Sequence, residues 1–241
     1  MSFRIRGFLL HLLASSLLAI GTICLVFLVW YPSPLHQAIG VTNIFLILLS
    51  VDVVIGPLLT LAVCKQGKKS LVFDLSLIIV LQLSAFLYGI YTIAQGRPVW
   101  IAYYNDRFDI VQAFEMDHAY REKAKIEFQK LSFTGPEFVA VKIPEGNSNI
   151  IAEGLFTGVD IPQRADLYQP YASETKLVSK KAQDLSELKK YNSADNVEKE
   201  LSKWPQANSF LPLKTNAQSM SVLLKRETGE VVAIVPLNPW K

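Results

Sequence analysis

Three long apolar runs dominate the first 96 residues of the chain. They extend over residues 8–30, 38–63 and 71–94. At about 1.5 Å per residue, a helix over each run is about 35–39 Å long, which is enough to cross a hydrocarbon core of about 30 Å with some tilt. Three such runs in succession predict a three-helix transmembrane domain over residues 1–96.

The pattern changes after residue 96, where shorter segments with strand and helix periodicity replace the apolar runs. Residues 99–104 and 108–114 predict a hairpin around Asn105-Asp106-Arg107, and residues 220–226 and 231–236 predict a second one. A further strand is predicted over 138–143 and mostly loop over 145–172, with helices over 117–131, 177–191 and 194–204. The sequence therefore predicts an α+β domain over residues 97–241 with a mainly antiparallel sheet.

Charge is distributed unevenly between these two parts. Residues 1–96 carry seven charged side chains and the whole net charge of +3, whereas residues 97–241 carry 19 basic and 19 acidic side chains. A balanced domain argues against nucleic acid as a partner. Cys24 and Cys64 both lie in the apolar part and the three histidines are scattered, so we predict neither a metal site nor a cofactor.

The basic residues around the apolar runs predict an orientation. Arg4 and Arg6 precede the first run, the loop 31–37 has no Lys or Arg, and the loop 65–70 has three lysines. The positive-inside rule then places the N-terminus in the cytoplasm. Three crossings of a bacterial inner membrane would place residues 97–241 in the periplasm.

Polar residues inside the second and third runs are the main candidates for a site. Asp52 lies near the middle of the second run, where a charged carboxylate costs at least about 2.5–3.5 kcal/mol. Gln82 lies at a similar depth in the third run, so an Asp52–Gln82 hydrogen bond between helices is one expectation. Contact of Asp52 with a polar group on a partner helix is another, and a proton relay is a third. Gly56-Pro57 follows one turn later and predicts a kink.

The sequence contains no motif that supports catalysis. It lacks the Gly-x-Ser-x-Gly, His-Glu-x-x-His, phosphate-loop and dinucleotide signatures. His118 follows Asp117 at the start of a predicted helix, where a lone histidine is typically a surface residue. We therefore do not expect an enzyme.

Several motifs resemble those of a known family. They are Tyr31-Pro32, the run from Val51 to Leu61 that contains Asp52 and Gly56-Pro57, Asp74-Leu75, Gln82-Leu83, Arg97-Pro98-Val99 and Asp106-Arg107-Phe108. Over residues 31–115 the chain resembles the type IV pilin accessory proteins of the TfpX/TfpZ type. Beyond residue 115 no motif of this family is recognised.

The resemblance implies a non-enzymatic inner-membrane factor or chaperone that assists its cognate type IV major pilin. Our hypothesis for its mode of action is that the second and third helices accommodate the pilin's N-terminal helix, which carries an amine and a glutamate. The candidate partner-binding residues are Asp52, Gly56, Pro57, Gln82, Arg97, Asp106 and Arg107. The alternative function is a membrane-anchored periplasmic sensor that binds a small ligand, and a pilin gene beside this one would favour the accessory factor.

Overall fold

The computed structural model describes residues 2–144, 146 and 149–240. The chain forms two compact units. One contains the residues up to Pro32 together with Val41–Gln95, and we call it the helical bundle. The other contains Ser33–Gly40 together with the residues from Gly96 onward, and we call it the sheet domain.

Three helices of the bundle are long and apolar enough to cross a membrane, which agrees with the prediction. Span one is Phe3–Trp30, made of α1 (Phe3–Cys24) and the π-helical η1 (Leu25–Trp30). Span two is Val41–Val63, made of α3 (Val41–Ser50), η2 (Val51–Ile55) and α4 (Gly56–Val63). Span three is α5 (Leu71–Gln95).

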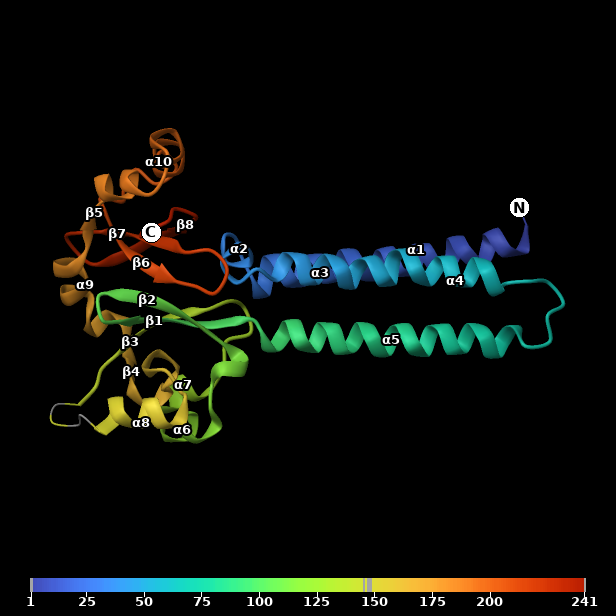
Figure 1. Ribbon diagram of the computed structural model, residues 1–241, viewed down its shortest axis with the longest axis horizontal. Helices are drawn as coiled ribbons and strands as arrows, with labels where there is room; N and C mark the ends of the chain where they lie inside the picture. The colour runs from blue at the N-terminus through green and yellow to red at the C-terminus, as the bar shows by residue number, and fades with distance from the viewer. Residues whose placement is uncertain (1, 145, 147–148, 241) are drawn as a thin grey trace. The chain divides into compact units, whose positions relative to one another are not determined.

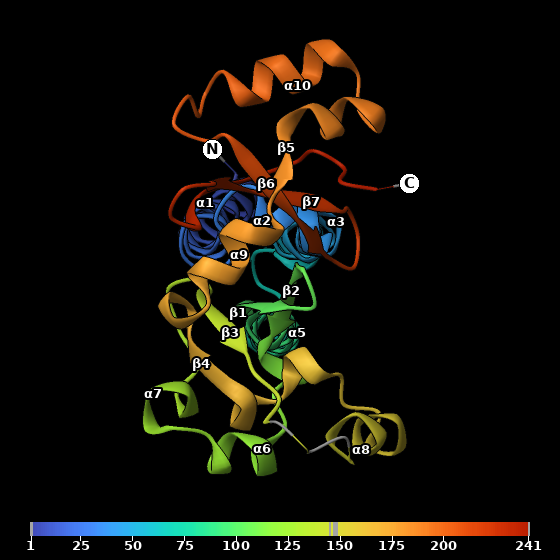
Figure 2. The same ribbon diagram turned by 90° about the vertical axis from the view of Figure 1, so that its left-hand side faces the viewer.

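The three spans pack side by side, and Figure 2 shows them end on. Helix α1 packs along α4, and α5 packs against α3 and α4. The Tyr31 hydroxyl donates a hydrogen bond of 2.6 Å to the carbonyl of Ile93 and so joins spans one and three. Asp74 opens span three with an ion pair to Lys68 at 2.5 Å, as expected for an acid at a helix N-terminus.

The sheet domain is built on one eight-stranded sheet, drawn in Figure 1. The strand order is β4-β3-β1-β2-β6-β7-β8, and β5 pairs with β6. Five strand pairs are antiparallel, whereas β1–β3 and β2–β6 are parallel, so the sheet is mixed but mainly antiparallel as predicted. The strands are β1 (Pro98–Tyr104), β2 (Arg107–Gln112), β3 (Glu137–Val141), β4 (Tyr168–Pro170), β5 (Gln183–Asp184), β6 (Ser209–Lys214), β7 (Met220–Lys225) and β8 (Glu230–Val235).

Alternate side chains of the strands enter different cores, as the period of two requires. One face of β1, β2, β6 and β7 packs under α9 (Thr175–Lys181) and α2 (Leu35–Ile39). The opposite face is covered at the β3 end by α7 (Ile126–Gln129) and by Ala124, which follows α6 (His118–Lys123). At the β8 end it is covered by the 3-10 helix η7 (Leu185–Lys190) and α10 (Ala194–Leu201).

The loop between spans one and two is part of the sheet domain's core. Its helix α2 inserts Ala38, which is fully buried, among Ile101, Leu213 and other core side chains. The carbonyl of Ala38 accepts hydrogen bonds from the backbone N–H groups of Ala217 and Gln218. Gly40 then ends α2 at a φ of +78°, and span two begins at Val41 rather than at residue 38.

The structure corrects three predictions for the sheet domain. The helix over 117–131 is two short helices, because the backbone is extended at Ala124 and Lys125. The helix over 177–191 breaks at Ala182, whose extended backbone leads into β5 and η7. The loop over 145–172 contains α8 (Asn149–Thr157), the 3-10 helices η4 (Ile161–Gln163) and η5 (Ala165–Leu167), and β4. Residues 145, 147 and 148 of that predicted loop lie outside the described residues.

Other predictions for the domain are confirmed. The first hairpin turns through Asn105 and Asp106, both at positive φ, as in the tight turns that suit the twist of two strands. The second hairpin turns at Gly229. Helix α10 lies within the predicted range, and its N-cap Ser193 accepts a hydrogen bond from the N–H of Asn196.

Candidate functional site

Asp52 lies in a π-helical turn near the middle of span two. The turn, η2, ends directly before Gly56 and Pro57. Because Pro57 has no backbone N–H, the carbonyl of Val53 loses its usual α-helical donor. The N–H of Gly56 bonds instead to the carbonyl of Val51, five residues earlier. Span two therefore contains a π-turn, with its wider hydrogen-bonded ring, directly before Gly56-Pro57, where the sequence predicted a kink.

Gln82 of span three packs directly on Gly56. A Cβ atom at Gly56 would lie 1.9 Å from Gln82 Nε2, so only glycine leaves room for this side chain. The close approach that Gly56 permits is thus that of the Gln82 side chain. Gln82 Nε2 donates a hydrogen bond of 3.3 Å to the backbone carbonyl of Asp52. The predicted Asp52–Gln82 contact between helices is present, and its acceptor is the main-chain oxygen.

Span one adds residues that the sequence analysis did not select. His11 Nδ1 lies 2.6 Å from Thr60 Oγ1 of span two. Asp52, Gly56 and Thr60 are spaced by four residues and so share one face of span two. His11 stands in a similar row with Gly7 and Ser15 on span one. This four-residue spacing of polar and small residues inside two apolar runs is the signal that would have identified the cluster.

These polar residues border a partly open cavity of about 430 Å³ formed by the helical bundle. Its wall is mostly apolar, and all three spans contribute to it. The apolar lining residues are Leu10, Ala14, Leu18, Leu75, Ile79, Leu83 and Phe86, and the polar ones are His11, Ser15, Asp52, Thr60 and Gln82. We call this space the bundle cavity.

Two oxygen atoms at the bundle cavity lack hydrogen-bond partners among the described residues. They are Asp52 Oδ2 and Gln82 Oε1, and the Asp52 residue is only 6% exposed. A buried polar atom without a partner costs about 1–3 kcal/mol, and more if it is charged. The bundle cavity can therefore accept an apolar group that brings a hydrogen-bond donor to this position.

The other three candidate residues lie in the sheet domain and are not together. Arg97 Nε donates to the carbonyl of Ser132 at 3.3 Å, next to the start of β1. Asp106 and Arg107 lie at the opposite end of the β1–β2 hairpin, about 23 Å away for a seven-residue strand. Asp106 pairs with Lys181 at 2.8 Å and Arg107 with Asp109 at 3.0 Å. Arg97 is therefore separated from this hairpin turn by the length of β1.

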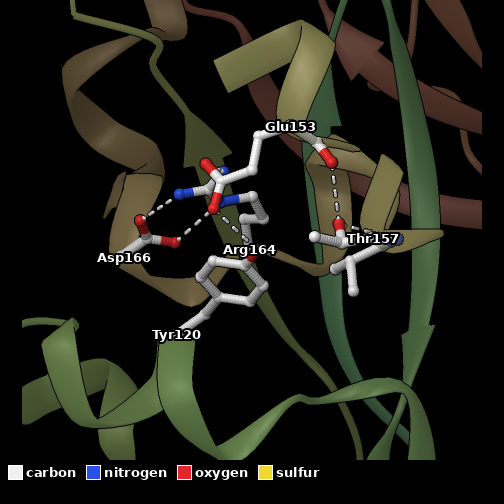
Figure 3. A network of polar contacts seen from close by, with 6 residues as sticks. Tyr120, Glu153, Thr157, Arg164 and Asp166 are labelled. Carbon is white, nitrogen blue, oxygen red and sulfur yellow. Dashed lines mark hydrogen bonds and ion pairs between the residues drawn. The ribbon is translucent and has the colours of Figure 1, made fainter. Parts of the chain in front are cut away.

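A buried arginine forms a polar network in the sheet domain, shown in Figure 3. Arg164 is 5% exposed and binds both carboxylate oxygens of Asp166, at 2.8 and 3.2 Å. It also bonds to Glu153 of α8 at 2.7 Å, and its guanidinium carbon lies 4.1 Å from the centre of the Tyr120 ring. Arg164 lowers the pKa of Glu153. The network joins α6, α8 and η5, so we interpret it as structural.

A small polar pocket of about 70 Å³ lies between β2 and η4. It is lined by three carboxylates, those of Asp109, Glu115 and Asp160, together with Lys214. Burial raises the pKa of Asp109, and the Arg107 side chain opposes that shift. Burial also raises the pKa of Glu115. Lys214 Nζ lies 3.9 Å from a carboxylate oxygen of Asp109 and 3.9 Å from one of Asp160. The positive charge in this pocket is therefore supplied by the lysine side chain.

His118, the histidine of the sheet domain, is also not part of a catalytic arrangement. It is an exposed residue of α6 whose Nδ1 lies 3.5 Å from Glu122 Oε1 one turn later, and Asp117 caps the same helix. Within the described parts of the chain, no group of three or more His, Cys, Asp or Glu side chains is arranged to hold a metal ion.

Comparison with known proteins gives consistent matches. The family model described as fimbrial assembly protein FimB matches residues 1–40. A fimbrial assembly protein of serogroup E1 from Dichelobacter nodosus is 32% identical over 96% of this chain and 94% of its own length. The serogroup I protein of the same organism is 35% identical over 75% of this chain and 70% of its own length. No solved structure matches the chain.

Proposed function

Since the chain belongs to the fimbrial assembly protein family, we propose that it is an accessory factor or chaperone that binds the cognate type IV major pilin. In this role it modulates the stability of the pilin or its assembly into pili, without enzymatic activity. The family membership agrees with the resemblance to type IV pilin accessory proteins and gives the chain a role in fimbrial assembly. Binding of the pilin is the further step that we propose.

The proposed location is the bacterial inner membrane, with the N-terminus in the cytoplasm and the sheet domain in the periplasm. Three apolar helices of sufficient length support membrane insertion. The lysines at 65, 68 and 69 and the arginines at 4 and 6 support the direction.

The bundle cavity is the observation that carries the proposal. A factor that handles a pilin inside the bilayer has to bind an apolar helix while that helix is surrounded by lipid. The cavity provides an apolar wall within the helical bundle and two acceptor oxygens without partners, Asp52 Oδ2 and Gln82 Oε1. The pilin's N-terminal helix is apolar and carries an amine, so it can satisfy these acceptors. A second contact of the sheet domain with the pilin's globular part would raise the effective affinity.

Photo-crosslinking in cells tests the docking site directly. A photoreactive amino acid is placed at Leu83, which lines the bundle cavity, and in a second strain at Leu81, which is 61% exposed and outside the lining. Both positions lie on span three, so expression and membrane insertion are matched. We expect capture of pilin from position 83 and much less from position 81. Equal capture from both, or none from 83, would contradict the proposed site.

The carboxyl group is tested by Asp52→Asn, with Asp74→Asn as the matched control at the end of span three. We expect Asp52→Asn to lower the level of pilin or of surface pili, whereas Asp74→Asn should leave both near the wild-type level. Normal piliation in the Asp52→Asn strain would make Asp52 a packing residue. Normal pilin levels and pili after deletion of the whole gene would contradict the accessory role itself and favour the sensor.

A further inference from the structure

A partly open cavity of about 290 Å³ lies in the sheet domain, where the parallel strands β1 and β3 both end. Its wall is formed by the turn of the β1–β2 hairpin, by the residues that end and follow β3, and by the start of α9. Most of this wall is apolar, and its aliphatic residues are Val141, Ile143 and Leu177. We call this space the strand-end cavity.

Tyr103 brings a buried hydroxyl group to the strand-end cavity. It lines the cavity although the residue is only 3% exposed. Its hydroxyl oxygen has no hydrogen-bond partner among the described residues, whereas the hydroxyl groups of Tyr168 and Tyr171 donate to main-chain carbonyls. Since a buried tyrosine hydroxyl usually has a partner, Tyr103 retains hydrogen-bonding capacity for a ligand.

Two carboxylates, those of Asp106 and Glu174, determine the charge of the strand-end cavity. Burial, and after it the charges of these two residues, raises the pKa of Tyr103 to about 12, so its hydroxyl keeps the proton at neutral pH. Asp106 is firmly paired with Lys181 at 2.8 Å. Glu174 is paired less closely, because Lys142 Nζ lies 3.8 Å from its Oε1, which is beyond hydrogen-bond distance. The Lys142 side chain is 66% exposed and can turn into water, so another cation can take its place.

We propose that the strand-end cavity binds an aliphatic primary ammonium group. Its three N–H donors meet the Glu174 carboxylate and the Tyr103 hydroxyl oxygen, and its alkyl stem lies on the apolar wall. A carboxylate ligand would instead be repelled by Asp106 and Glu174. The ammonium chemistry is shared by the lysine side chain of a protein and by a small free amine, and the test distinguishes these two sources.

Saturation-transfer NMR with the full-length protein in a nonionic detergent tests the proposal, with protein-free micelles as the blank. The probes are 1,5-diaminopentane, Nα-acetyl-lysine methylamide and, as an anion of similar length, pentanoate. We expect both amines to bind and pentanoate not to bind. Glu174→Gln should weaken amine binding about tenfold or more, because it removes a charged acceptor. The matched control is Glu230→Gln, since Glu230 is also paired with one lysine, Lys225, but lies outside the cavity wall, and it should leave binding unchanged.

The variant Tyr103→Phe separates binding from folding. It removes a hydroxyl group that is buried without a partner, so we expect the Tm to stay level or to rise while amine binding falls severalfold. A Tm well below that of the wild type together with unchanged amine binding would assign the hydroxyl group to the fold and overturn its role in the site.

Two further outcomes would overturn the proposal. Pentanoate that binds as tightly as the diamine would contradict the selectivity for a cation, and amines that bind Glu174→Gln as tightly as the wild type would place them elsewhere. Tighter binding of the blocked lysine than of the diamine would support a protein side chain as the ligand, whereas the reverse order would support a free amine. The test needs no pilin, so its failure leaves the docking of pilin in the bundle cavity untouched.

Discussion

Replacement of Arg164 by methionine should destabilise the sheet domain strongly, because it removes the cation from a buried network. The substitution keeps most of the apolar stem that packs beside Tyr120. It leaves the carboxylate of Asp166, whose side chain is only 16% exposed, without its bidentate partner. Glu153 also loses its ion pair, but its side chain is 47% exposed and water can replace the lost contact.

The magnitude follows from these exposures. Removal of one partner of a buried ion pair typically costs about 3–5 kcal/mol, and the partial exposure of Asp166 favours the lower end. The exposed contact with Glu153 adds little because water screens it, and the stacking on Tyr120 adds about 0.5–2 kcal/mol. We expect a total of about 3–5 kcal/mol. For a domain of about 150 residues this corresponds to a fall in Tm of roughly 10–15 °C.

Thermal unfolding of the full-length protein in detergent, followed by near-ultraviolet circular dichroism, measures this change. Hydrogen exchange of peptides from α8 and η5 should rise before that of the β6–β7 peptides, since the network joins the former. The control is Lys189→Met, because the Lys189–Glu198 pair is exposed and should contribute below about 1 kcal/mol. The double variant Arg164→Met/Asp166→Asn should regain part of the loss. A Tm within 2 °C of wild type for Arg164→Met would refute the reasoning.

Three further predictions concern other parts of the chain. Gly56→Ala places a carbon 1.9 Å from the Gln82 amide, so we expect weaker packing of spans two and three and a lower Tm in detergent, whereas Gly21→Ala, with nothing within 4 Å, should be neutral. Ala38→Asp buries a carboxylate in the sheet domain and should lower its Tm by several degrees, which a melting curve checks. Asp109 has a raised pKa in the folded state, so its contribution to stability is present at low pH and is lost as pH rises through that pKa. We therefore expect the Tm of Asp109→Asn, relative to that of the wild type at the same pH, to be higher at pH 7.5 than at pH 4. A relative Tm that does not change with pH would contradict this.

The membrane-spanning helices and the hairpins were predictable from the sequence, whereas the points at which predicted helices are interrupted were not. The three spans followed from the length of their apolar runs, and both hairpins followed from turn residues such as Asn105-Asp106 and Gly229. The helix over 117–131 has an unbroken apolar stripe, but the side chain of Gln129 donates to the carbonyls of Glu122 and Ala124. That tertiary arrangement stabilises an extended step at Ala124 that periodicity does not reveal.

Strand β6 was missed for a different reason. Its sequence Ser-Phe-Leu-Pro-Leu-Lys contains Pro212, and a proline inside a short apolar run normally argues against a central strand. Yet β6 lies between β2 and β7, with only Leu213 and Lys214 paired to β2. Pro212 pairs with Ser221 of β7 and lies outside that short register, so its missing donor costs the sheet little. The short β2–β6 register also explains why sequence alone did not join the two hairpins.

The candidate site was predicted in part because its polar residues are rare in apolar runs. Asp52, Gly56 and Gln82 were identified individually, and the structure brings them together. His11 was not identified, because it was judged as one of three scattered histidines and not by its position relative to Ser15. The distance between Arg97 and the hairpin turn was predictable from the seven residues of β1, had strand length been considered.

The position of the loop Ser33–Gly40 bears on the topology independently of charge. Ala38 is fully buried in a core with Ile101 and Leu213, so this loop and the sheet domain lie on the same side of any membrane that the chain crosses. Between Gly40 and Gly96 the chain passes through spans two and three. Two crossings return the chain to its starting side, whereas a single crossing would separate Ala38 from its core neighbours. The packing thus favours insertion of both spans or of neither, and their length and apolar character favour both. The direction of insertion rests on the basic residues alone, which is why the reversal of charge in the loop 65–70 is the change to which the proposed orientation is most sensitive.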